Sequence, residues 1–206
     1  KVGVAQVNVL DKAIHMAVED LFSATNFILD NADQFGVNPS NIVISGSSAG
    51  AISVMQAEYE IANATQWASV LPAGFNYAGV MSFSGAILSR EGKVDFKKSP
   101  CPTLMLHGTS DELVPYDQIK VFNLGFFGGG KLVERFKKYG LNYNMYHFTD
   151  YGHEIAGSMD TTLDLQLKFL ETNVMQKKMR IVEAWISDPD VFKGSGPQSR
   201  KELYGN

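Results

Sequence analysis

The sequence predicts an α/β fold, with a mostly parallel sheet and helices on both of its faces. Short apolar segments rich in β-branched residues alternate with longer segments whose apolar residues recur at helical spacing. This alternation is typical of β–α–β units, in which consecutive strands lie parallel and are covered by helices. The 206 residues suffice for one domain, and 45% hydrophobic with 19% charged residues is a globular composition.

The predicted strands are apolar, and most are followed by a loop of small or polar residues. They cover residues 41–45, 77–83, 103–106 and 141–148. The predicted helices cover residues 11–34, 51–62, 116–124, 132–139 and 159–177. We expect residues 1–178 to form this unit. Residues 179–206 are expected to form a C-terminal tail, in which 181–186 adds a turn of helix before a loop rich in proline and glycine.

The bulk composition argues against several classes of protein. A formal net charge of −4 offers no basic surface for nucleic acid. No apolar run is long enough for a membrane-spanning helix. The single cysteine, Cys101, cannot form a disulfide framework or a thiolate metal cluster, and no H-E-x-x-H pair occurs, so we expect no metal and no cofactor.

The strongest chemical signal is a G-S-S-A-G pentapeptide between a predicted strand and a predicted helix. Its central residue is Ser48, and its glycines are Gly46 and Gly50. At such a turn the glycines permit close approach of strand and helix, and the serine hydroxyl is held above the sheet at a helix N-terminus. We therefore predict Ser48 as a nucleophile, with the backbone N–H of Ala49 as a donor to the oxyanion. The neighbouring Ser45 is expected to be buried in the strand.

A serine hydroxyl needs a base and an oriented acid to become nucleophilic, and in this fold the order along the chain is serine, acid, histidine. Asp111 lies in the loop after the strand 103–106, at the edge where parallel sheets place their sites. We predict it as the acid. Glu112, one residue later, and Asp150, which we expect to shape the following loop, are the alternatives.

The base is predicted to be His153, which follows a glycine in the loop after the last strand. The ordinary pKa of histidine, near 6.5, suits proton transfer at neutral pH. Of the other histidines, His15 is expected at the helix surface and His147 in the last strand. His107 ends a strand beside the predicted site, and we expect it to hold the acid loop.

These segments resemble carboxylesterases of the α/β-hydrolase superfamily, in the lipase/esterase group. Residues 17–20, 35–39 and 42–50 resemble the approach to that family's nucleophile, residues 107–115 its acid loop, and Gly152–His153 its histidine loop. The resemblance spans about residues 17–170, and it implies hydrolysis of a small-molecule or carbohydrate ester through an acyl-enzyme, without a metal. The implied substrates carry short acyl chains or are acyl decorations of polysaccharides.

One departure from the family concerns the start of the chain. Family members carry several strands and a His-Gly-Gly-type loop before the nucleophile, whereas here Ser48 comes early. The apolar strand 41–45 is expected to lie in the middle of a sheet, because an exposed edge invites aggregation. We therefore hypothesise that an N-terminal segment or a second chain completes the sheet and supplies the other oxyanion donor.

Two alternative functions remain open from the sequence. A serine peptidase of the same fold uses identical groups, and a non-catalytic binding module could keep the fold. The glycine-rich segment 125–131 superficially fits a phosphate-binding loop. However, Leu132 follows it at the position where such a loop needs serine or threonine. We expect this segment to be a flexible loop near Asp111, with Phe126 and Phe127 facing either the substrate or the core.

Overall fold

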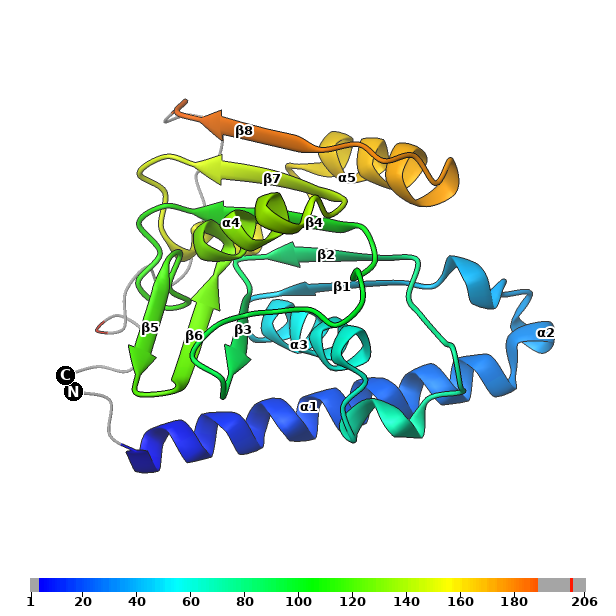
Figure 1. The fold of residues 1–206 in the computed structure, drawn as a ribbon. Coiled ribbons are helices and arrows are strands. Elements are labelled where there is room, and N and C mark those ends of the chain that lie inside the picture. The colour runs from blue at the N-terminus through cyan, green and yellow to red at the C-terminus, as the bar shows by residue number, and fades with distance from the viewer. Residues whose placement is uncertain (1–3, 189–200, 202–206) are drawn as a thin grey trace.

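The computed structural model describes residues 4–188 and residue 201. Its centre is a five-stranded sheet in the order β1-β2-β4-β7-β8 (Figure 1). Every neighbouring pair in this sheet is parallel. The strands are β1 (Val43–Ser47), β2 (Gly79–Phe83), β4 (Thr103–Gly108), β7 (Tyr143–Phe148) and β8 (Val182–Ile186).

A second, smaller sheet lies beside the carboxyl ends of the main strands (Figure 1). It has three antiparallel strands in the order β3-β6-β5. Its strands are β3 (Ala86–Ser89), β5 (Gln118–Val121) and β6 (Leu124–Gly128). Because β3 follows β2 and β5 follows the loop after β4, this small sheet is built from the chain leaving two central strands.

Helices cover both faces of the main sheet, and the strand side chains alternate between them. One face packs through Val80, Met105 and Met145 against the helices α1 and α3 and the helix α4. The other packs through Phe83, Leu106 and Phe148 against η3, α5 and η4. The helical elements are α1 (Val4–Asp30), α2 (Ala32–Phe35), η1 (Pro39–Asn41), α3 (Ala49–Asn63), η2 (Trp67–Val70), α4 (Gly129–Tyr139), η3 (His153–Gly157), α5 (Leu163–Phe169) and η4 (Leu170–Met175).

The predicted fold class is confirmed, and the central strands lie within about two residues of their predicted positions. Gly36 ends the first helical region, close to the predicted end at residue 34, with a φ of 66° in the left-handed region. The helical region expected at 159–177 begins later, at Leu163, because residues 159–162 form a turn.

Two predicted helices are wrong. Residues 116–124 form β5 and the turn into β6, where Ile119 and Val121 alternate with polar residues and Phe122 has a φ of 54°. In the second, residues 182–186 form β8, which extends the main sheet parallel to β7. Residues 189–200 and 202–206 of the expected tail lie outside the described residues.

The position of β1 also differs from the prediction, because it lies at an edge of the described sheet and not in the middle. Only β2 pairs with it among the described strands. Ser45, expected to be buried, is exposed there. Among the described residues, no helix has the length and apolar character to cross a membrane.

Candidate active site

The G-S-S-A-G segment forms a sharp turn from β1 into α3. Ser48 has φ 52° and ψ −116°, an unusual backbone conformation for a residue with a side chain. Its N–H donates to the carbonyl of Phe83 at 2.9 Å, which anchors the turn to β2. A Cβ added to Gly46 would lie 2.3 Å from the carbonyl of Gly50, so strand and helix meet closely at this point.

The two glycines differ in their roles. A Cβ added to Gly50 would meet nothing within 4 Å outside its own helix. The close approach therefore depends on the absent side chain of Gly46, whereas Gly50 contributes the backbone that is approached. The prediction that both glycines make room for packing is correct for Gly46 and wrong for Gly50.

The structure brings Ser48, His153 and Asp111 together, although they lie on three separate loops. His153 Nε2 lies 2.8 Å from Ser48 Oγ, and His153 Nδ1 lies 2.9 Å from Asp111 Oδ2. With Asp111 ionised, Nδ1 carries the proton and donates a hydrogen bond to the carboxylate. Nε2 is then unprotonated and can accept a hydrogen bond from the serine hydroxyl. A serine hydroxyl needs such a chain of hydrogen bonds, to a base and from that base to an acid, to become nucleophilic.

The carboxylate of Asp111 is buried and fully engaged. Its Oδ1 accepts from the backbone N–H groups of Leu113 and Val114, both at 2.9 Å. Burial by itself raises the pKa of Asp111, but the facing N–H groups of His107 and His153 lower it by more. The pKa of Asp111 therefore lies well below its ordinary value, and the carboxylate is ionised at neutral pH.

The competing acids are not placed at this position. Asp150 is exposed and has a φ of 63°, and its backbone N–H donates to Thr109 Oγ1 at 2.9 Å. It therefore shapes the junction between the acid and histidine loops, as expected. Glu112 is exposed, whereas the carboxylate of Asp111 points inward toward His153.

The N-terminal turn of α3 supplies a site for negative charge. Ala49 is the first residue of α3, so its N–H has no carbonyl partner within the helix, and the residue is exposed. The helix dipole adds a partial positive charge at the same place. The geometry suits the predicted role of Ala49 as an oxyanion donor.

Ser47 takes part in the site in a way that the sequence did not reveal. Its hydroxyl donates to the carbonyl of Ala156, in η3, at 2.5 Å. Since η3 begins at His153, this bond fastens the histidine loop to the serine turn. A serine beside the pentapeptide centre was the available signal, but its partner lies 109 residues away.

The remaining histidines lie away from Ser48 Oγ. His15 is half-buried and stacks on Trp67, with ring centroids 3.8 Å apart. His147 is buried, its Nδ1 lies 2.6 Å from the hydroxyl oxygen of Tyr116, and its ring stacks on Trp185. Burial lowers the pKa of His147, against the opposing effect of Glu183.

The glycine-rich segment is not the flexible loop that was expected. Residues 124–128 form β6, and Gly129 begins α4. Phe127 is buried in the core, and the partly buried Phe126 packs against the same core cluster.

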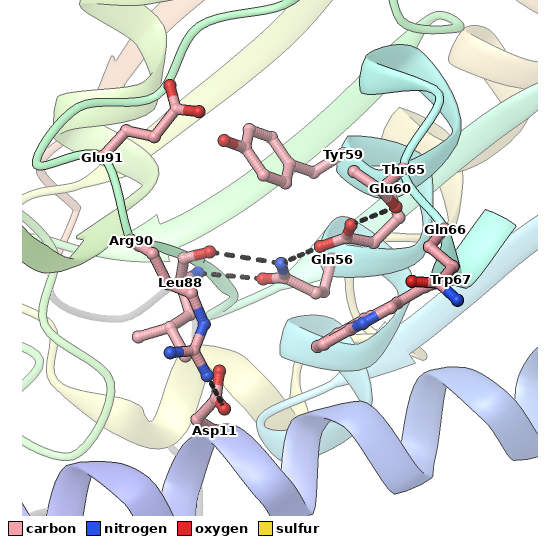
Figure 2. A pocket seen from close by; sticks show the side chains of 10 residues that line it. All are labelled: Asp11, Gln56, Tyr59, Glu60, Thr65, Gln66, Trp67, Leu88, Arg90 and Glu91. Carbon is pink, nitrogen blue, oxygen red and sulfur yellow. Dashed lines mark hydrogen bonds and ion pairs between the residues drawn. The ribbon is translucent and has the colours of Figure 1, made fainter.

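A cavity of about 260 Å³ lies elsewhere, between α1, α3 and the end of β3 (Figure 2). Several of its polar side chains have partners within the chain: the Gln56 amide pairs with Leu88 and Glu60, and Arg90 pairs with Asp11. Glu60 also accepts from Thr65 at 2.5 Å. These bonds link β3, α1 and α3, and Ser48, Asp111 and His153 are not among the residues that line the cavity.

Comparison with known proteins gives a family-model match over part of the chain. A family model described as BD-FAE matches residues 8–78, which include α1, β1 and the Ser48 turn. No curated protein matches the chain.

Solved structures provide the wider likeness. A truncated carbohydrate esterase from gut microbiota has a TM-score of 0.51 at 16% identity, over 75% of this chain and 67% of that one. Esterase PE8 has a TM-score of 0.48 at 21% identity, over 73% and 61%. A puromycin-hydrolyzing peptidase of Mycobacterium tuberculosis has a TM-score of 0.49 at 19% identity, over 82% and 27%.

The chain thus spans about two thirds or less of the length of these solved structures. Structural similarity at such low sequence identity is evidence about the fold only. Taken with the parallel sheet and its helices on both faces, it establishes that this chain has the α/β-hydrolase fold.

Proposed function

We propose that this chain hydrolyses carboxylic esters, with Ser48 as nucleophile, His153 as general base and Asp111 as the acid that orients it. One observation carries the proposal. A continuous line of hydrogen bonds runs from Ser48 Oγ through both ring nitrogens of His153 to Asp111, at 2.8 and 2.9 Å. It starts at a serine held in the backbone conformation of a strand-to-helix turn.

In the proposed reaction, Ser48 Oγ attacks the ester carbonyl while His153 Nε2 takes its proton. The imidazolium formed is stabilised by Asp111, which stays ionised. His153 then gives the proton to the leaving alcohol, and an ester bond to Ser48 remains. Water, deprotonated by the same histidine, cleaves this acyl-enzyme and restores the serine.

The tetrahedral intermediates carry a negative oxygen that needs hydrogen-bond donors. The N–H of Ala49, at the positive end of α3, is proposed as one. We further propose that a strand pairing with the free edge of β1, from an additional segment or a second chain, brings the other donor beside Ser48. An intact-mass measurement on the natural source, together with its oligomeric state, tests this. A monomer that starts at Lys1 and is fully active would contradict it.

The proposed substrates are esters of short acyl groups, including those carried by carbohydrates. One solved neighbour is named a carbohydrate esterase, and this supports the substrate class without fixing it. Amide hydrolysis uses the same groups, so a peptide anilide is assayed beside the esters. Faster turnover of the anilide would favour the peptidase alternative.

The test is hydrolysis of p-nitrophenyl acetate by the wild type and by Ser48→Ala. We expect loss of about 10³-fold or more in kcat. The matched control is Ser45→Ala, which removes an exposed hydroxyl from the preceding strand β1 and is expected to retain activity. Equal activity of Ser48→Ala and the wild type would refute Ser48 as nucleophile. Equal inactivity of both folded proteins would favour either the lack of the second oxyanion donor or a non-catalytic role.

A further inference from the structure

We propose that His107 is a positioning residue: its Nε2–H donates to the carbonyl of Val114 in the acid loop and faces the carboxylate of Asp111, while the first N–H of α4 fixes its tautomer. This inference rests on the proposed function, since it concerns how the acid of the serine–histidine–acid line is held. His107 itself does not contact Ser48. It lies at the end of β4, on the face of the sheet that α4 covers.

The tautomer of His107 follows from its neighbours. The backbone N–H of Gly129 donates to His107 Nδ1 at 3.2 Å, so Nδ1 is an acceptor and carries no proton. Nε2 therefore carries the hydrogen, which it donates to the carbonyl of Val114 at 3.1 Å, and it also faces Asp111 Oδ2 at 3.4 Å. The ring is only 1% exposed, which removes water as a competing partner.

Asp111 Oδ2 is thus placed between two imidazoles. His153 Nδ1 lies 2.9 Å from this oxygen on the side of Ser48, and His107 Nε2 lies 3.4 Å away on the side of α4. The two backbone donors occupy Oδ1. With donors on both oxygens, the carboxylate cannot rotate away from His153 without losing hydrogen bonds in a dry environment.

Three successive glycines bring α4 close enough for this arrangement. A Cβ on Gly128 would lie 1.7 Å from the carbonyl oxygen of Pro115, and one on Gly130 would lie 2.5 Å from the ring of Tyr116. A Cβ on Gly129 would lie 3.0 Å from His107 Nδ1. The glycine-rich segment therefore allows the start of α4 to pack directly on the acid loop and on His107.

Within the described part of the chain, few titratable groups lie around His107. They are Asp111 from its own loop, Tyr116 edge-on at 5.6 Å between ring centroids, and His147 opposite it on β7. His153 is linked to these groups by its hydrogen bond to Asp111. The N–H of His107 helps to hold the pKa of Asp111 below its ordinary value. Without that N–H, the carboxylate would hold a proton to higher pH and would be oriented less firmly.

The test compares wild type, His107→Leu and His107→Gln on p-nitrophenyl acetate across pH 5 to 9, with kcat and KM measured separately. Leucine removes the donor, whereas glutamine can present an amide N–H in the place of Nε2. We expect His107→Leu to lose roughly 10- to 100-fold in kcat with little change in KM, because the base is misaligned. The acidic limb of its pH profile should move to higher pH. His107→Gln should recover most of the rate.

Several results would overturn the proposal. One is a His107→Leu enzyme with the kcat and pH profile of the wild type. Another is an equal loss of kcat in His107→Leu and His107→Gln with an unchanged pH profile, which would indicate that His107 contributes only by packing. If His107→Leu does not fold, Gly129→Ala, whose methyl group presses on His107 Nδ1, gives the same comparison. ¹⁵N NMR of labelled histidines decides independently of activity, because a proton on His107 Nδ1 would refute the assignment. An active Ser48→Ala enzyme would instead refute the proposed function.

Discussion

The hydroxyl of Ser47 donates to the carbonyl of Ala156 at 2.5 Å and joins the serine turn to the histidine loop. The bond spans the site from β1 to η3, so the residue next to the nucleophile helps to place the imidazole. It shows how the two ends of the Ser48–His153 hydrogen bond are tied together by a second, neighbouring contact.

Removing this bond should impair catalysis more than stability. In Ser47→Ala the carbonyl of Ala156 loses its donor, and we expect a stability loss of about 1 kcal/mol. A slightly freer histidine loop should lower kcat about tenfold with KM little changed. Steady-state kinetics and urea unfolding measure both quantities, with Ser45→Ala as the control. Unchanged kcat in Ser47→Ala would contradict a positioning role for this bond.

The two glycines of the pentapeptide should respond very differently to alanine. In Gly46→Ala the new methyl group would lie 2.3 Å from the backbone of Gly50, so the turn must open, and we expect a loss of roughly 3 kcal/mol or more in the free energy of unfolding. Gly50→Ala should be neutral or stabilise by up to about 1 kcal/mol, since it adds a helix-favouring residue in open space. Urea unfolding of both proteins measures this. Similar losses in the two variants would contradict the asymmetry.

The parts of the fold that were predicted from the sequence carry local signals. The apolar run 103–106 became β4, and the strand-turn-helix around Ser48 formed where the glycines and apolar residues indicated. Ser48, Asp111 and His153 were singled out because each follows a predicted strand, and parallel strands bring their carboxyl ends to one edge. The structure places the three within hydrogen-bonding distance in that order.

What the sequence did not reveal depends on contacts between distant segments. β8 was missed although Val182, Ala184 and Ile186 alternate with other residues, because its strand character is stabilised by pairing with β7. The edge position of β1 follows from the order of strands, which no local pattern encodes. The hydrogen bond from Gly129 to His107 likewise depends on where α4 packs.

The side-chain amide of Gln56 bonds the backbone of β3 as a neighbouring strand would. Its replacement should lower the stability of the fold. Its Oε1 accepts from the N–H of Leu88 at 2.9 Å and its Nε2 donates to the carbonyl of Leu88 at 3.2 Å, both in a buried setting (Figure 2). Gln56→Leu leaves both backbone groups unpaired, so we expect a loss of roughly 2–4 kcal/mol in the free energy of unfolding. Gln66→Leu is the control, because Gln66 lines the same cavity but is exposed. Equal stability of the two variants would show that Gln56 does not brace β3.

Glu58 should make the protein less stable as the pH rises toward neutrality. It is buried in α3, its Oε1 accepts from the N–H of Cys101 at 2.7 Å, and its Oε2 has no hydrogen-bond partner among the described residues. Burial raises the pKa of Glu58 from 4.5 to about 7, despite the opposing bond from Cys101. The folded chain therefore binds this proton more tightly than the unfolded chain does.

The sign of the pH effect follows directly. Below about pH 4.5 the carboxyl group is protonated in both states, and its stabilising contribution is fully present. As the pH rises to about 7 the unfolded chain ionises first, and roughly 3 kcal/mol of stability is lost. Glu58→Gln cannot ionise, so its free energy of unfolding should fall less between these two pH values. Urea unfolding at a series of pH values, with the exposed Glu134→Gln as control, measures the difference; identical profiles for Glu58→Gln and the wild type would show that Glu58 is ionised in the folded chain at neutral pH.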